Sequence, residues 1–164
     1  MSIFKRFNKK PEPIVINDEL GTFTLKNPEK DKFYDGTVNW LGVDVGVSLR
    51  LDSSDSLTAD ITLKNLHEIV AQAADWDKKL RQYAVEDMCD EDGLIEIWGD
   101  WDEEDEASPI TKEEFLSRIS LGFMHVYPND EIYFDYDLDG MFTDHGLGIF
   151  ANTSGEILSS GLQG

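Results

Sequence analysis

A long stretch of helical periodicity, flanked on both sides by strand-like segments, constrains the fold of this chain more than any other feature. Between residues 62 and 88 the apolar side chains recur at spacings of three and four, which places them on one face of a helix: Leu63, Leu66, Val70, Ala73, Leu80 and Ala84. Ile69, Trp76 and Tyr83 widen this apolar face. The sequence therefore predicts one long amphipathic helix over residues 62–88.

The segments before this helix alternate apolar and polar residues, which is the period of a half-buried strand. Residues 22–26, 32–40 and 43–51 follow this pattern. The last of them is the clearest, because five apolar side chains share one face: Val43, Val45, Val47, Leu49 and Leu51. Leu41 and Gly42 separate the second and third segments, so we expect a hairpin with a two-residue loop.

The segments after the long helix predict further helical pieces and then a return to strands. Residues 94–101 have the character of a short helical piece, and Thr111 with Glu114 forms a capping box that predicts a helix from about Lys112. Strand-like runs follow at residues 121–128, 131–139, 146–152 and 156–161. This order predicts an α+β fold, with an antiparallel sheet of about six or seven strands and the long amphipathic helix and shorter helices packed on one face.

Length and composition indicate one folded domain. The chain has 164 residues, of which 40% are hydrophobic. Residues 1–17 carry four basic residues in the first ten positions, followed by a Pro-Glu-Pro stretch, so we predict a mobile basic N-terminal tail and a single α+β domain at 18–164.

Neither a membrane span nor a bound cofactor is predicted. No apolar run approaches the roughly 18 to 20 residues that a membrane span requires. Cys89 is the only cysteine, which suits the reducing cytoplasm, and the histidines lack zinc-ligand spacing, so we predict no metal and no cofactor.

The charge of the chain is strongly acidic and unevenly placed. There are 34 acidic and 14 basic residues, which gives a net charge of −20. Residues 82–164 contain 21 of the acidic residues and only Lys112 and Arg118 as basic ones. Nucleic-acid binding requires Lys and Arg to displace counterions from phosphates, so it is disfavoured. A basic protein is the partner that this charge favours.

Residues 86–106 concentrate this charge, with 12 acidic residues and no basic one. A solvated loop is one interpretation of such a run. The other is an interaction surface in which two tryptophans anchor a partner among carboxylates, since aromatic residues are favoured at interface centres. On the second interpretation the partner-binding residues are Trp98, Trp101, Asp102, Glu103, Glu104 and Asp105.

The stretch DYDLDGMFTDHG, residues 135–146, resembles a calcium-binding loop. Asp135, Asp137, Asp139 and Gly140 match the first half of that pattern, but the twelfth position holds Gly146 instead of the bidentate Glu. The aspartates also alternate with apolar residues at the period of a strand. We therefore predict a strand and a turn here, without a calcium site.

The same region offers the one candidate for catalysis. Asp137, Asp139, Asp144 and His145 are residue types that serve as general acids and bases or as metal ligands. A metal-dependent or acid/base hydrolase using this region is therefore an alternative function. No nucleophile motif and no phosphate-binding glycine loop accompanies them, so an enzyme is not the favoured interpretation.

Three motifs carry a resemblance to a known family: WDKKLRQYA from Trp76, WGDWDEEDE from Trp98 followed by ITKEEF from Ile110, and DGMFTDH from Asp139 followed by GLGIF. Over residues 19–164 the chain resembles the bacterial family called domain of unknown function 2262. The resemblance implies a single bacterial cytoplasmic α+β domain. In that family the last motif more typically reads F-W-G-H, and Thr143 and Asp144 depart from it.

Together these observations favour a non-catalytic protein that presents its acidic half to a basic protein partner, as a monomer or a small homo-oligomer. A bacterial immunity-type inhibitor of a basic toxin is the most concrete version. The hydrolase is the alternative from another class. A housekeeping scaffold, whose charge only keeps it soluble, is the third.

Overall fold

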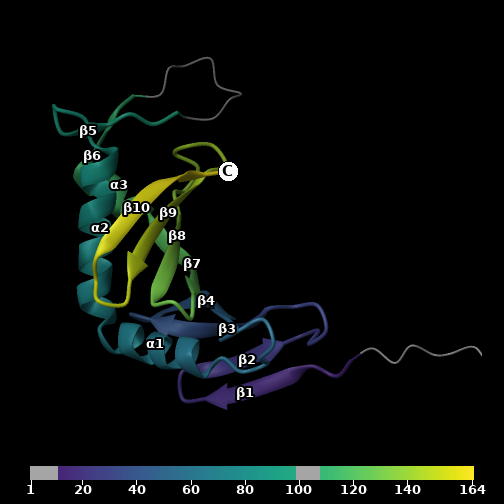
Figure 1. Cartoon of the computed structure of the whole chain (residues 1–164). Helices are drawn as coiled ribbons and strands as arrows, with labels where there is room; N and C mark the ends of the chain where they lie inside the picture. The colour runs from purple at the N-terminus through teal and green to yellow at the C-terminus, as the bar shows by residue number, and fades with distance from the viewer. Residues whose placement is uncertain (1–10, 99–107) are drawn as a thin grey trace, which may run out of the picture.

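The structure, a computed structural model, describes residues 11–98 and 108–164 (Figure 1). Ten strands and three helices occur in these ranges. In chain order they are β1 Ile14–Asp18, β2 Gly21–Leu25, β3 Phe33–Trp40, β4 Val43–Arg50, α1 Asp60–Ala71, α2 Ala73–Met88, β5 Leu94–Ile95, β6 Ile110–Thr111, α3 Lys112–Arg118, β7 Ser120–Val126, β8 Glu131–Asp137, β9 Gly146–Asn152 and β10 Ile157–Gln163. The predicted α+β class is confirmed.

The main sheet is larger than predicted, with eight strands in the order β1-β2-β3-β4-β7-β8-β9-β10. It is also mixed, because β4 and β7 pair in parallel while the other neighbours are antiparallel. Parallel neighbours need a crossover connection, and the helices between β4 and β7 supply it. One added strand is β1, whose residues 14–17 lie in the segment that the sequence assigns to the tail.

The predicted long helix is two helices, which is a correction. Helix α1 ends at Ala71 and α2 begins at Ala73, with Gln72 between them outside helical geometry, at φ −116° and ψ 23°. The chain changes direction there, so that α1 lies under β4 and β7 while α2 runs beside β8 to β10 (Figure 1). Because the sheet is strongly twisted, two shorter helices follow its surface where one straight helix would leave it.

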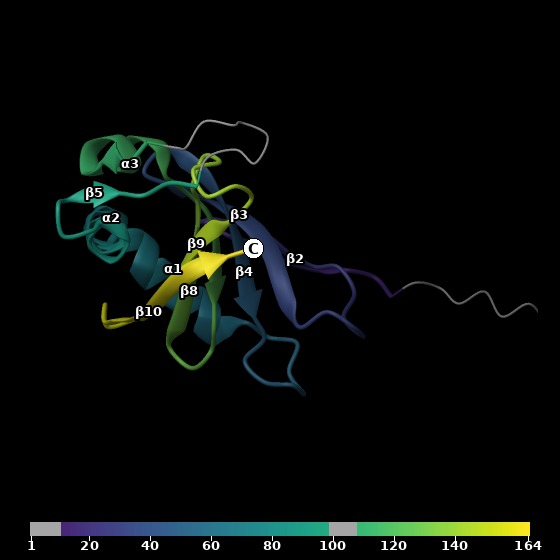
Figure 2. The same cartoon turned by 90° about the horizontal axis from the view of Figure 1, so that it is seen from above.

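Helices α1 and α2 lie on one side of the sheet (Figure 2), and their buried residues include Leu66, Ile69, Trp76 and Leu80. Trp76 and Leu80 are buried as the helical period predicts. Trp76 contacts Phe134 of β8, with the ring centroids 5.4 Å apart, and Trp40 of β3 reaches the same ring at 6.4 Å. The core therefore lies between the helices and this face, and no helix of residues 11–98 or 108–164 covers the opposite face of the sheet.

The predicted hairpin between β3 and β4 is confirmed. Leu41 and Gly42 form its two-residue loop, and both have positive φ angles, 54° and 92°. Val45, Val47 and Leu49 are buried, whereas Val43, the first residue of β4 after the hairpin loop, is 60% exposed.

The short helical piece expected at residues 94–101 is wrong for its described part. Leu94 and Ile95 form β5, which pairs with β6, and Ile95 is buried. The Asp90 side chain accepts hydrogen bonds from the backbone N–H groups of Asp92 and Leu94, which holds a turn in place of a helix. In the described ranges, no helix has the length and apolar character that a membrane crossing requires.

The predicted start of α3 is confirmed and yields a test. Thr111 Oγ1 accepts a hydrogen bond from the Glu114 backbone N–H at 3.2 Å. Replacing Thr111 by Ala removes this cap and should lower the free energy of unfolding by about 1 kcal/mol in urea melts. Thr111→Ser keeps the hydroxyl and should stay close to the wild type. Equal losses in both variants would contradict a capping role.

Candidate functional site

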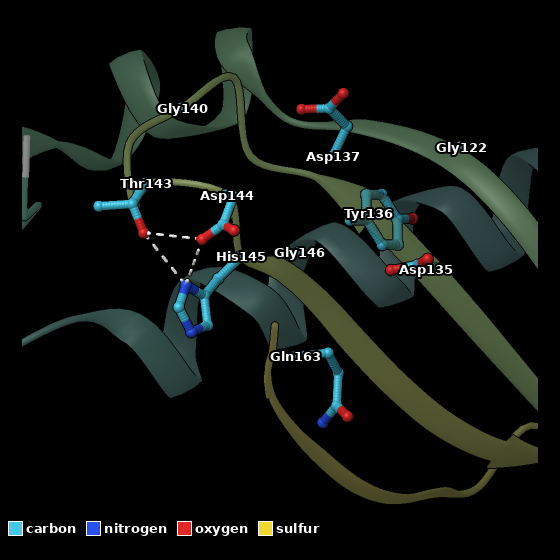
Figure 3. A pocket seen from close by; sticks show the side chains of 10 residues that line it. All are labelled: Gly122, Asp135, Tyr136, Asp137, Gly140, Thr143, Asp144, His145, Gly146 and Gln163. Atoms are coloured by element: carbon cyan, nitrogen blue, oxygen red, sulfur yellow. Dashed lines mark hydrogen bonds and ion pairs between the residues drawn. The ribbon is translucent and has the colours of Figure 1, made fainter. Parts of the chain in front are cut away.

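An open pocket of about 510 Å³ lies where β8 ends and β9 begins (Figure 3). The loop between these strands, residues 138–145, forms one wall. Neighbouring strands form the rest. The lining residues are Gly122, Asp135, Tyr136, Asp137, Gly140, Thr143, Asp144, His145, Gly146 and Gln163.

The alternation of β8 determines which side chains face this pocket. Ile132, Phe134 and Tyr136 are fully buried on the helix side, so Asp135 and Asp137 point to the opposite face of the sheet. The strand predicted within the calcium-like stretch is confirmed, and the chain turns after it at Asp139 and Gly140, whose φ angles are 50° and 69°.

The hydrolase interpretation requires Asp139 beside Asp137, Asp144 and His145, but Asp139 does not line the pocket. Its Oδ2 lies 2.8 Å from Arg118 Nε, and its backbone carbonyl accepts a second bond from the same guanidinium at 3.0 Å. Asp137 accepts a bond from the Asp139 backbone N–H at 2.7 Å and thereby supports the turn. Asp137, Asp144 and His145 line the pocket, whereas Asp139 is held by the arginine of α3.

The His145 ring is fixed through its Nδ1 atom. This atom lies 3.1 Å from Thr143 Oγ1, 3.1 Å from the Phe142 carbonyl oxygen and 3.4 Å from Asp144 Oδ1. Thr143 has a φ of 62°, a left-handed conformation that costs a residue with a Cβ atom roughly 1–2 kcal/mol. The Thr143 hydroxyl hydrogen-bonds its neighbours from this position, so the loop keeps a strained residue where it shapes the pocket.

Asp135 is a site residue that sequence reasoning placed only in the calcium-like pattern. Burial raises the pKa of its carboxyl above the ordinary value, and the nearby charge of Asp137 raises it further. Within the described ranges, this carboxylate forms no ion pair and accepts no hydrogen bond. The two-residue spacing of Asp135 and Asp137 was the available signal. Gln163 of β10 was missed entirely, because only the pairing of Gln163 with Gly146 brings it here.

Trp98 connects the acidic segment with this pocket. Its backbone N–H donates to the Met141 carbonyl at 2.9 Å. The indole meets the rings of Phe142 and His145 edge-on, with centroids 5.6 Å and 5.2 Å apart, and is still 52% exposed. The other predicted partner-binding residues lie outside the described residues: Trp101, Asp102, Glu103, Glu104 and Asp105.

The electrostatic character of the pocket follows from its lining. Asp135, Asp137 and Asp144 contribute carboxylates, and among the described lining residues none is Lys or Arg. Within residues 11–98 and 108–164, no group of three or more His, Cys, Asp or Glu side chains has an arrangement that could hold a metal ion.

The comparisons with known proteins identify a family. No curated protein and no solved structure matches the chain. A family model described as an uncharacterized protein conserved in bacteria matches residues 17–162, which confirms the resemblance seen in the motifs. The chain therefore belongs to this family, domain of unknown function 2262.

Proposed function

We propose that this protein is a non-catalytic binding domain whose acidic pocket receives a cationic side chain of a basic protein partner. The observation that carries the proposal is the lining of the pocket by Asp135, Asp137 and Asp144, without a Lys or Arg among its described lining. Its volume of about 510 Å³ falls within the range of clefts that hold small groups, roughly 300–1,000 Å³.

Because Asp135 is half-buried, a cation that pairs with it should bind with a net gain in free energy. Its carboxylate is costly to ionise, because burial raises its pKa above the ordinary value and the charge of Asp137 raises it further. A guanidinium or ammonium group would stabilise the ionised form and supply hydrogen-bond donors in a partly desolvated site. Arginine fits best, since its planar fork can contact two carboxylates together.

The charge of the whole chain supports a basic protein as the source of this cation. A net charge of −20 attracts cationic proteins and excludes acidic ones. Trp98, exposed at the edge of the His145 ring, offers an aromatic anchor beside the pocket. A bacterial immunity-type inhibitor of a basic toxin is the most concrete form of this proposal.

The separation of Asp139 from the pocket favours binding over hydrolysis. A hydrolase that used Asp137, Asp139, Asp144 and His145 would need these four groups around one substrate. Asp139 instead forms its ion pair with Arg118. The remaining residues suit recognition of charge, which does not require a nucleophile.

A titration with short peptides tests the pocket. We expect an acetylated, amidated Gly-Arg-Gly peptide to shift the amide resonances of Gly146 and Gln163 in a saturable manner, and the Gly-Gln-Gly peptide to leave them unchanged. The variant D135N/D137N should weaken arginine-peptide binding about tenfold or more, which corresponds to roughly 1.4 kcal/mol. Asparagine keeps the acceptor oxygen that holds the turn at Asp139.

D44N/D55N is the matched control, because both aspartates are exposed and lie outside the pocket. It removes two charges, as D135N/D137N does, and should change affinity less than twofold. Equal shifts with both peptides, or equal affinity in D135N/D137N and the wild type, would refute the pocket as the cation site.

We propose that the acidic run, residues 86–106, increases the rate of association with the partner. Replacing Asp102, Glu103, Glu104 and Asp105 by their amides should lower the association rate with a basic protein and flatten its salt dependence, since exposed charges act within a Debye length of about 8 Å. Stopped-flow measurements at two salt concentrations, with cytochrome c as the basic probe, separate this effect from dissociation. An unchanged association rate would assign the run to a solvated loop.

A further inference from the structure

Strand β10 is one of the two edges of the main sheet, and it pairs with β9 on one side (Figure 1). Within residues 11–98 and 108–164, no strand pairs with its other side. The outer side of an edge strand presents backbone N–H and C=O groups that a further strand can use. None of the seven residues of β10 is buried, and Leu158 is 48% exposed. The free edge of β10 is therefore accessible for pairing.

The two edges of the sheet differ in the residues that protect them. Proteins commonly keep other strands away from an edge with proline, charged side chains or bulges. At the opposite edge, Pro13 directly precedes β1 and Asp18 ends it. Residues 157–164 contain neither a proline nor a charged residue, although the chain is strongly acidic. A bulge at Leu158 disturbs only the beginning of β10. The remainder of this edge lacks such protection.

The end of β10 reaches the acidic pocket. Gln163 pairs with Gly146 of β9, and both residues line that pocket. The Asp135 carboxylate lies over β9, since a Cβ atom built on Gly146 would be 3.0 Å from Asp135 Oδ1. Neighbouring strands lie about 4.8 Å apart, so a strand added to β10 would be two spacings, or roughly 10 Å, from β9. An extended arginine side chain and one hydrogen bond together span such a distance.

The beginning of β10 adjoins a second open pocket, of about 280 Å³, between the strand and the flank of α2. Glu86 and Glu156 line this pocket. Lys79 lines it too, but its ammonium donates to a backbone carbonyl in the turn between β9 and β10. Farther along the strand, Asp87 Oδ2 accepts a hydrogen bond from Ser160 Oγ at 2.6 Å. Carboxylates thus accompany the uncharged strand, which favours a basic segment as its partner.

We propose that the basic partner binds as an extended segment that pairs with the free edge of β10 and places one arginine in the acidic pocket. This inference rests on the proposed function and names the form in which the partner presents its cation. Backbone hydrogen bonds to β10 supply affinity, and the pocket supplies specificity for arginine. A second copy of the chain is less suited to this edge, because each copy carries a net charge of −20.

A longer peptide separates pairing with β10 from binding in the pocket. The probe is acetylated, amidated Thr-Arg-Val-Thr-Val-Thr-Val, whose β-branched residues favour a strand. It should bind about tenfold or more tightly than the Gly-Arg-Gly peptide and slow the hydrogen exchange of alternate backbone amides of β10. If the tripeptide shifts Gly146 and Gln163 but the heptapeptide binds no more tightly, strand pairing is refuted and the pocket stands. If the tripeptide itself does not bind, the proposed function fails.

N-methylation of the heptapeptide tests the backbone hydrogen bonds directly. In a strand that pairs on one side, alternate N–H groups point toward the sheet and the others point to solvent. One peptide is therefore N-methylated at positions 3 and 5, and its matched control at positions 4 and 6. One of the two should bind about tenfold more weakly than the unmethylated peptide, and the other should keep its affinity within about threefold. Equal affinities of the two methylated peptides would overturn the proposal.

Two further measurements, on the full chain, complete the test. The D135N/D137N variant should bind the heptapeptide about tenfold more weakly, whereas a heptapeptide with glutamine in place of arginine should bind the variant and the wild type equally, through β10 alone. Slowed exchange at β1 to the same extent as at β10 would refute a specific edge. Sedimentation of the free protein examines the second copy: a dimer whose β10 amides are already protected would assign the edge to self-association and overturn the proposal.

Discussion

Replacing Phe134 by alanine should lower the free energy of unfolding by about 3–5 kcal/mol, the usual range for a buried aromatic ring. Phe134 is fully buried at the centre of the core. Its ring contacts Trp76 of α2 and Trp40 of β3, so truncation leaves a cavity between the sheet and the helix. Two large indoles cannot both move to fill that cavity while the backbone stays in place.

Phe150→Ala is the control for Phe134→Ala. Phe150 lies on the adjacent strand β9, on the sheet face without helices, and is 36% exposed. Its removal should cost about 1 kcal/mol or less, from the lost contact with Tyr133. Urea melts that gave similar losses for the two variants would show that the core does not lie on the helix side of β8.

Leu80→Ala should cost about 2–5 kcal/mol, since Leu80 is fully buried on the apolar face of α2. Alanine preserves helix propensity, so the loss measures packing of α2 against the sheet. Leu158→Ala provides the matched control on β10, because Leu158 is 48% exposed. It should change stability by about 0.5 kcal/mol or less. A loss well below 1 kcal/mol for Leu80→Ala in a reversible melt would contradict the assigned helix face.

Local patterns were sufficient where the structure depends on local chemistry. The alternation in β8 separates Phe134 from Asp135, and the Thr111 hydroxyl caps α3 as the motif indicates. The hairpin loop at Leu41 and Gly42 follows from its length and its glycine. In each case the residues from which the feature is predicted are also the residues that form the contacts.

Features that depend on tertiary packing could not be predicted in this way. The apolar period continues through Gln72, so it gives no sign that the helix breaks there to follow the twisted sheet. Periodicity identifies the buried face of a strand but not its direction, and the parallel pairing of β4 with β7 was therefore missed. Strand β1 was assigned to the tail because its neighbours are basic and proline-rich.

The candidate site likewise combines features that local patterns predict with features that depend on tertiary packing. The spacing of Asp135 and Asp137 places both on one face, which the sequence indicates. Asp139 does not line the pocket because it pairs with Arg118, a residue 21 positions earlier in the chain. Gln163 and Gly122 reach the pocket through the order of strands in the sheet. No local motif encodes these long-range contacts.

The most direct test of the acidic pocket is the pKa of Asp135, measured by ¹³C NMR of its carboxyl carbon with and without saturating Gly-Arg-Gly peptide. Burial raises this pKa in the free protein. A bound guanidinium stabilises the ionised carboxylate, so the pKa should fall on binding, and by linkage the peptide should bind more tightly as pH rises through the pKa of the free protein. A pKa of Asp135 that stays raised at saturating peptide would contradict the account, because the cation would then bind elsewhere.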